Sequence, residues 1–175
     1  MTALAGLRVL DLTRLLPGGF CSLLLADFGA DVLKVEDTGM GDYIRWSPPY
    51  YEGADDSAKS ALFLALNRNK RSVRVNLKEE RGREVLLRLA RDADVLLESF
   101  RPGVMERLGV GWERLHAENP RLVYCAITGY ASRAGSPSMA RASSTVATRR
   151  PASSAIARAL ATRSPFERAI CPSGR

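Results

Sequence analysis

The sequence has a single histidine, His116, and three widely separated cysteines, Cys21, Cys125 and Cys171, among its 175 residues. Three cysteines at such distances give neither a disulfide framework nor the close spacing of metal ligands, so we predict no metal site. No spacing indicates a Ser-His-Asp set. The histidine is beside Glu118 in an amphipathic stretch, where a surface or half-buried histidine is the ordinary interpretation and a proton carrier is the alternative.

Long apolar runs are also missing. The longest ones, such as residues 23–26, are far shorter than the roughly 18 residues that a membrane-spanning helix needs. The N-terminus lacks the charged and then apolar layout of a signal peptide. With 46% hydrophobic and 26% charged residues, the composition indicates a soluble globular domain, which we expect to be cytoplasmic and to have no membrane partner.

Negative charge is scarce in the last quarter of the chain. Residues 131–175 contain eight arginines and one acidic residue, whereas residues 1–130 contain 18 basic and 18 acidic residues. The net charge of +7 therefore comes from the C-terminal segment. A nucleic-acid-binding domain would carry its basic surface on a folded face, so we do not expect residues 1–130 to bind nucleic acid.

The C-terminal segment also has no Lys, Asp, Tyr or Trp, and it contains 11 alanines and nine serines. This composition, without a sustained apolar period, is typical of a segment that cannot form a core. We therefore predict two parts. Residues 1–130 form a folded domain, and residues 131–175 are a low-complexity Ala/Ser/Arg tail that is disordered or results from a shifted reading frame.

The first 130 residues alternate between two patterns. Short apolar runs predict strands, and apolar residues at helical spacing predict helices. The predicted strands are residues 6–13, 30–36, 72–77, 94–98 and 122–128, and the predicted helices are residues 20–28, 60–67, 79–90, 102–108 and 112–118. Residues 37–60 are rich in turn residues. The alternation predicts an open, Rossmann-like parallel sheet with flanking helices, whose ligand sites lie at the carboxyl ends of the strands.

Three places in the sequence could contact an anion. Residues 17–19, Pro-Gly-Gly, precede a helix whose free N–H groups suit a phosphate, although a tight packing turn is equally open. Residues 67–71 form a basic cluster that is either a phosphate contact or a solvated strand edge. Arg101 and Arg107 follow a predicted strand, where surface ion pairs are the alternative. The stretch GMGDYI at residues 39–44 lacks the third glycine of a dinucleotide loop.

Four blocks together resemble a known family. The blocks GLRVLDLTRLLPGGFCSLLLADFGADVLKVE, NRNKRSVRVNLK, ADVLLESFRPGVMERLGVGWERL and NPRLVYCAITGY are similar, in order and spacing, to the N-terminal part of the class III coenzyme A transferases. This family includes formyl-CoA and carnitine-CoA transferases and the α-methylacyl-CoA racemases. The resemblance covers about residues 4–130.

The resemblance implies that coenzyme A is the anion and that it is bound as a substrate. By position it assigns coenzyme A contacts to Leu16, Pro17, Asn69, Lys70, Arg71, Val75, Asn76, Leu77, Lys78, Ser99, Phe100, Arg101 and Arg107. The partners it implies are an acyl-CoA, a carboxylic acid acceptor and, in intact members, a second copy of the chain. A cation that often follows the second strand in the family is replaced here by Asp37 and Thr38.

The catalytic residues of the family come after the Thr-Gly-Tyr block: an Asp nucleophile in the transferases, and a His with an Asp in the racemases. Residues 131–175 contain no Asp, so we assign no catalytic residue and expect a CoA-binding fragment without turnover. The longer insertion at residues 42–72 favours the transferases over the racemase-like alternative. The third alternative is a non-catalytic protein whose basic tail binds nucleic acid or an acidic partner.

Overall fold

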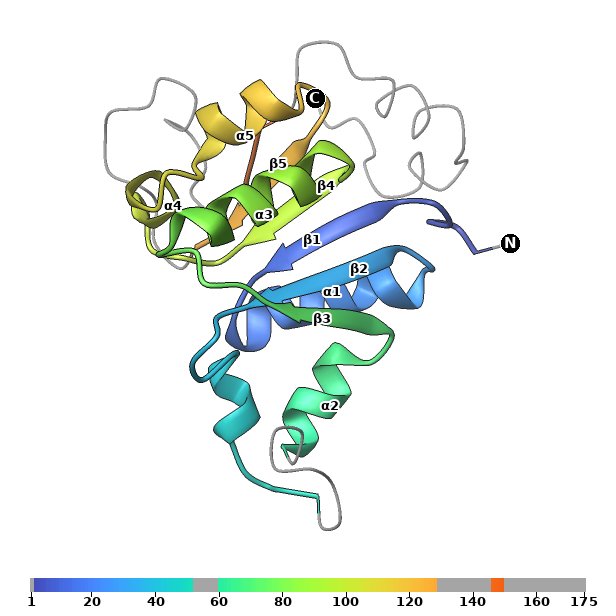
Figure 1. Ribbon diagram of the computed structural model, residues 1–175. Helices are drawn as coiled ribbons and strands as arrows, with labels where there is room; N and C mark the ends of the chain where they lie inside the picture. The colour runs from blue at the N-terminus through green and yellow to red at the C-terminus, as the bar shows by residue number, and fades with distance from the viewer. Residues whose placement is uncertain (1, 52–59, 129–145, 150–175) are drawn as a thin grey trace, which may run out of the picture.

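Six strands form one sheet in the order β3-β2-β1-β4-β5-β6 (Figure 1). The computed structural model describes residues 2–51, 60–128 and 146–149. β1 to β5 are parallel, and β6 pairs antiparallel with β5. The strands are β1 (Arg8–Leu12), β2 (Asp31–Glu36), β3 (Lys70–Arg74), β4 (Val95–Glu98), β5 (Val123–Ile127) and β6 (Val146–Arg149). The helices are α1 (Leu15–Asp27), η1 (Tyr43–Trp46, a 3-10 helix), α2 (Ala61–Asn67), α3 (Glu80–Arg91), α4 (Val104–Arg107) and α5 (Trp112–Glu118).

The strand order confirms the open, Rossmann-like α/β fold that the sequence predicted. From β1 the chain winds outward through β2 to β3, and it then returns to place β4 on the other side of β1. The direction of winding therefore reverses between β1 and β4. In open α/β sheets, ligands bind outside the carboxyl ends of the strands at such a reversal.

Helices cover both faces of the sheet. Successive side chains of a strand point to opposite faces, so Val9 packs on the α1 side while Leu10 packs on the side of α3 and α5. Both of these β1 side chains are almost fully buried. Burial on both faces explains why the parallel strands are nearly continuous apolar runs in the sequence.

The third strand begins earlier than the sequence indicated: β3 spans Lys70–Arg74, whereas alternation predicted residues 72–77. Asn69, with a left-handed φ of 62°, turns the chain from α2 into this strand. The Lys70 side chain reaches Asp11 of β1. Because Asp11 is distant in the sequence, the alternation of residues within the strand could not predict this contact.

Four residues of the basic segment are part of the sheet. Val146–Arg149 form β6, in which Val146 pairs with Ile127. The prediction of disorder for the rest of residues 131–175 lies outside the described residues. The composition of this segment predicted no strand, so β6 was not expected from the sequence.

An apolar stripe runs along the outer surface of α1. It consists of Leu16, Phe20, Leu24 and Phe28, which are spaced four residues apart and are 42–57% exposed. Residues at this spacing lie on one face of a helix. A helix that is apolar on all sides is normally buried. The stripe is therefore a surface that is typical of a contact with another protein element.

We expect the purified chain to self-associate through this α1 stripe, because the stripe contains no charged side chain that would oppose association. The double substitution Phe20→Glu with Leu24→Glu should raise the monomer fraction measured by sedimentation velocity, with an unchanged circular dichroism spectrum. Arg88→Glu, on the exposed side of α3, is the matched control and should leave association unaltered. A monodisperse monomer of the unchanged chain at high concentration would argue against the prediction.

Candidate functional site

The loops that follow β1 and β4 are joined at the point where the winding reverses. The Arg14 amide N–H donates a hydrogen bond to Ser99 Oγ at 2.9 Å, and the Ser99 hydroxyl lies 3.5 Å from the Arg14 carbonyl oxygen. These contacts connect backbone positions that are 85 residues apart in the sequence. These hydrogen bonds therefore fix the backbone of both loops at the carboxyl edge of the sheet, where α/β folds bind their ligands.

The Arg14 guanidinium also contacts the segment that follows β2, at the same carboxyl edge of the sheet. Its Nη1 donates to the Tyr43 hydroxyl at 2.9 Å, and its Nη2 donates to Asp37 Oδ2 at 3.0 Å. Its central carbon lies 5.0 Å from the centre of the Tyr43 ring and 5.3 Å from that of Phe100, both within cation-π range. With 28% of its side chain exposed, Arg14 forms a surface suited to a phosphate or a planar heterocycle.

Several cations on the carboxyl edge, among them three of the predicted contacts, have no ionic partner among the described residues. In the described part of the chain, the side chains of Lys78, Arg101 and Arg107 are exposed and make no hydrogen bond or ion pair. Figure 1 shows α4, which contains Arg107, near the start of α3, on the side to which the parallel strands point. These side chains are available to an anionic ligand without first breaking an ion pair.

The loop after β3 lies on the same edge and contains four of the predicted contacts. Val75 is buried and its amide donates to the Glu36 carbonyl oxygen at 2.8 Å, while Leu77 packs against the α3 core. The Asn76 side chain donates to Glu79 and accepts from the Lys78 amide. Of these four residues Lys78 has the exposed side chain, so it is the one best placed to meet a ligand.

The structure places the other predicted contacts, Asn69, Lys70 and Arg71, at the start of β3 and thus at the opposite, amino edge. Arg71 makes a bidentate pair with Asp31 at 2.7 and 2.8 Å, and Asn69 donates to Asp27. The Lys70 side chain is 1% exposed, and its ammonium lies within hydrogen-bond distance of four acceptors, in Asp11, Gly19, Ser22 and Asn67, which its three N–H groups share. Burial lowers the pKa of Lys70, and the Asp11 carboxylate offsets part of that effect. These three contacts stay predictions.

The glycine pair at the start of α1 has a packing role. Gly18 and Gly19 are buried, and a Cβ atom at Gly18 would lie 2.1 Å from Thr13 Cβ. Leu16 and Pro17, which the resemblance assigned to ligand binding, are exposed at the carboxyl edge. The sequence predicted a turn at residues 17–19 before a helix, but these residues lie inside α1, which already begins at Leu15. The glycines there allow close packing on Thr13, and the phosphate contact remains a prediction.

A buried carboxylate, Glu98 at the end of β4, fixes the aromatic part of the site. Its Oε2 accepts the Phe100 amide N–H at 2.6 Å, and its Oε1 accepts the Tyr124 hydroxyl at 3.2 Å. Burial raises the pKa of Glu98, these two hydrogen bonds lower it in part, and the nearby Glu106 charge raises it further. The carboxylate thus holds the backbone that carries the Phe100 ring beside Arg14.

A second buried carboxylate, Glu36 at the end of β2, accepts hydrogen bonds from three residues. Arg45 Nε and Nη2 each lie 2.7 Å from its oxygens, Ser72 Oγ donates at 2.6 Å, and the Asp42 amide donates at 2.9 Å. Although burial raises the pKa of Glu36, the hydrogen bonds from Arg45, Ser72 and Asp42 lower it to about 2. The folded state therefore binds this proton less readily than the unfolded chain does.

From this pKa we expect the free energy of unfolding to fall by about 2 kcal/mol as the pH drops from 4.5 to about 2. Urea titrations across that range measure the fall. Glu36→Gln should be less stable at pH 7 and should show a shallower fall, because its side chain does not titrate. Glu84→Gln, on an exposed part of α3, is the control. An equal pH slope in Glu36→Gln and the unchanged chain would contradict the assignment.

Sequence reasoning missed three residues of this site: Arg14, Asp37 and Tyr43. Arg14 is the second residue after β1, and Asp37 directly follows β2, so their positions at strand ends were visible signals. Tyr43 lies in η1, within a stretch predicted to be irregular, and nothing local indicated that its hydroxyl meets Arg14. The lone His116 stacks on Trp112 at 4.5 Å within α5, which gives it a packing contact.

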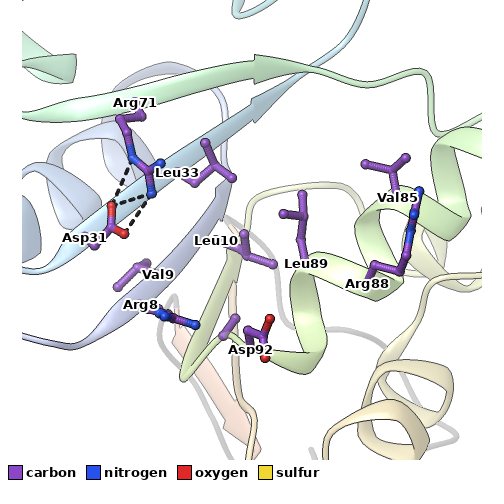
Figure 2. Close-up of a pocket in the computed structure, with 11 residues that line it drawn as sticks. Arg8, Val9, Leu10, Asp31, Leu33, Arg71, Val85, Arg88, Leu89 and Asp92 are labelled. Carbon is purple, nitrogen blue, oxygen red and sulfur yellow. Dashed lines mark hydrogen bonds and ion pairs between the residues drawn. The ribbon is translucent and has the colours of Figure 1, made fainter.

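A hollow of about 480 Å³ lies on the other edge of the molecule (Figure 2). Its apolar floor comes from Leu10, Leu33 and Leu89, and its rim includes Arg8 and Arg71. Figure 2 shows Arg71 turned to Asp31, so this guanidinium is already paired. The hollow therefore belongs to the amino edge, away from the cluster around Arg14.

The described residues contain neither a cluster of metal-ligating side chains nor a helix that could span a membrane. Among residues 2–51, 60–128 and 146–149, no group of three or more His, Cys, Asp or Glu side chains could hold a metal ion. Within the same ranges, no helix has both the length and the apolar character needed to cross a membrane.

Comparisons with known proteins give consistent matches. The sequence model of CoA-transferase family III matches residues 4–161. A succinyl-CoA:mesaconate CoA-transferase from Haloarcula marismortui is 48% identical over 130 residues, which are 74% of this chain and 33% of that protein. A formyl-CoA:oxalate CoA-transferase from a Bradyrhizobium species is 44% identical over 128 residues, or 73% of this chain and 29% of that protein.

The fold is matched among solved structures as well. The crystal structure of a CAIB/BAIF family protein from Brucella suis is similar with a TM-score of 0.69 and 43% identity, over 74% of this chain and 34% of that chain. This chain thus spans about a third of the length of the relatives that it matches.

Proposed function

This chain belongs to CoA-transferase family III, and from that premise we propose that it binds the coenzyme A part of an acyl-CoA at the carboxyl edge of its sheet. The observation that carries the proposal is the cluster at the reversal of winding. There Arg14 lies within cation-π range of Tyr43 and Phe100, and Arg101 and Arg107, which have no ion pair with any described residue, lie on the same edge. Coenzyme A offers phosphates to guanidinium groups and an adenine ring to an aromatic surface.

We propose that the described residues supply binding and that the catalytic carboxylate comes from elsewhere. The buried acids at the strand ends are occupied: Glu36 by Arg45, and Glu98 by Phe100 and Tyr124. The names of the relatives pair succinyl-CoA or formyl-CoA with mesaconate, glutarate or oxalate. A small carboxylic acid is therefore the acceptor class that we propose, with a second copy of the chain as the partner of the complete enzyme.

The binding proposal is tested by calorimetric titration of coenzyme A into the full chain. We expect Arg101→Ala with Arg107→Ala to raise the Kd at least tenfold, because two charge-assisted contacts to phosphate are lost. Arg88→Ala removes another exposed arginine, which lies on α3 and lines the hollow at the amino edge, and should leave the Kd unchanged. An unchanged Kd in the double variant, or an equal rise in Arg88→Ala, would overturn the proposed location.

Turnover is a separate expectation. We expect no transfer of coenzyme A from succinyl-CoA or formyl-CoA to a dicarboxylate by residues 1–175 alone, and no racemisation of a 2-methylacyl-CoA. Liquid chromatography of the acyl-CoA products measures both reactions. A transferred thioester would show that this chain contains its own nucleophile, and a racemised product would favour the racemase-like alternative.

A further inference from the structure

The loop that presents Arg14 is in a strained conformation. Leu15 has a φ of 63°, in the left-handed region that a branched side chain rarely adopts. Such a conformation costs about 1–3 kcal/mol and persists only where the surroundings hold it. Since Leu15 begins α1 and directly follows Arg14, the conformation of Leu15 sets the angle between the Arg14 backbone and α1.

Asp42, a carboxylate from the segment before η1, holds this conformation. It is 2% exposed, and its Oδ1 accepts the Leu15 amide N–H at 3.1 Å and the Ile44 amide N–H at 3.2 Å. The same oxygen therefore ties the loop after β1 to the first turn of η1. Tyr43, whose hydroxyl and ring contact Arg14, lies between Asp42 and Ile44 at the start of η1.

The charge of Asp42 is balanced from β2. Lys34 Nζ, which is 1% exposed, lies 2.9 Å from Asp42 Oδ2 and also donates to the Thr13 carbonyl oxygen at 2.9 Å. The Asp42 amide in turn donates to Glu36 at 2.9 Å. A buried charge is tolerated when it is paired and hydrogen-bonded. Here Oδ1 accepts the two amide N–H groups, and Oδ2 forms the ion pair with Lys34 but accepts no hydrogen bond from the described residues. Lys34 and Asp42 together thus hold residues 13 and 15, on either side of Arg14.

We propose that Asp42 is a positioning residue for the ligand site: it holds Leu15 and η1 so that the Arg14 guanidinium lies between the Tyr43 and Phe100 rings. Asp37 also contacts Arg14, but its carboxylate is about one-third exposed and binds the side chain rather than the backbone of the loop. The buried Asp42 carboxylate is therefore the group that fixes the backbone next to Arg14. Its effect on coenzyme A affinity rests on the proposed function.

Two readouts on the full chain test this role. In Asp42→Ala, nuclear Overhauser contacts from the Arg14 side chain to the Tyr43 and Phe100 rings should be lost, and the Kd for coenzyme A should rise about tenfold. Asp42→Asn keeps an acceptor oxygen for the Leu15 and Ile44 amides, so it should retain the contacts and most of the affinity. Leu115→Ala, a buried position in α5, lowers stability without removing a group that binds Arg14, Leu15 or Tyr43, and it should retain both readouts.

The outcomes separate this inference from the proposed function. If the unchanged chain fails to bind coenzyme A, the proposed function fails, while the Arg14 contacts in Asp42→Ala still decide the positioning role. Retention of those contacts in a folded Asp42→Ala chain would overturn the inference. Should Asp42→Ala not fold, hydrogen exchange of the Leu15 and Ile44 amides in Asp42→Asn provides the test, because both amides should stay protected while the Arg14 contacts persist. Loss of that protection with undisturbed Arg14 contacts would also overturn the inference.

Discussion

Replacing Gly18 by alanine is expected to destabilise this protein by about 2 kcal/mol, which lowers the Tm by roughly 5 °C. The added Cβ atom would lie 2.1 Å from Thr13 Cβ and 2.5 Å from both outer atoms of that side chain. Thr13 cannot turn away, because its amide and hydroxyl both donate to the buried Asp11. Either α1 or the loop after β1 must therefore move, and each carries part of the candidate site.

Gly19→Ala is the matched control for this substitution. Gly19 is the next residue of the same helix and is also buried, but a Cβ atom there would meet Leu66 at 3.8 Å, an ordinary contact. Alanine is the better helix former by about 1 kcal/mol, so Gly19→Ala should be neutral or stabilising. Thermal unfolding followed by circular dichroism measures both variants. Equal Tm values for the two would show that Gly18 does not pack on Thr13 as described.

Gly82→Ala is the second substitution with a large expected effect. Its Cβ atom would lie 1.9 Å from the carbonyl oxygen of Asn76 and 2.7 Å from the carbonyl carbon. Because the obstacle is backbone, the change must separate α3 from the loop after β3 or distort the helix. We expect a loss of about 2–3 kcal/mol in the free energy of unfolding and a displaced Lys78.

Urea unfolding and hydrogen exchange of the residue 75–78 amides measure this effect. Glu84→Ala, two residues along the same helix, removes an exposed side chain and should change the free energy of unfolding by less than about 0.5 kcal/mol. Protection of the Val75 amide, which bonds to Glu36, should fall in Gly82→Ala and persist in Glu84→Ala. Unaltered protection in both variants would mean that the loop does not rest on Gly82.

The fold was predictable from the sequence because its strands are buried on both faces. Apolar runs such as residues 6–13 and 94–98 gave β1 and β4, and the alternation with helices gave the parallel sheet and its carboxyl edge. That edge also contains Leu16, Ser99 and Arg101, which the resemblance assigned to the ligand. Local patterns were sufficient here because the period of each element is set by its own residues.

The site itself depends on contacts that no local pattern contains. Lys70 and Arg71 are adjacent and cationic, yet one ammonium is buried on Asp11 and the other side chain pairs with Asp31 on the opposite face of β3. Arg14 was overlooked because its partners Asp37, Tyr43 and Phe100 come from three later segments. The strand-end position was visible in the sequence, whereas the meeting of those side chains is a product of the sheet order.

The most direct test of the account is an amide-resolved titration of the full chain with coenzyme A, followed by heteronuclear NMR. We predict chemical-shift changes at Arg14, Ser99 and Arg101, on the carboxyl edge, with little change at Arg8 and Asp31 on the amino edge. Changes confined to the amino edge, around Asp31, Asn69 and Arg71, would contradict the placement of the ligand. No change at any amide at millimolar coenzyme A would contradict binding itself.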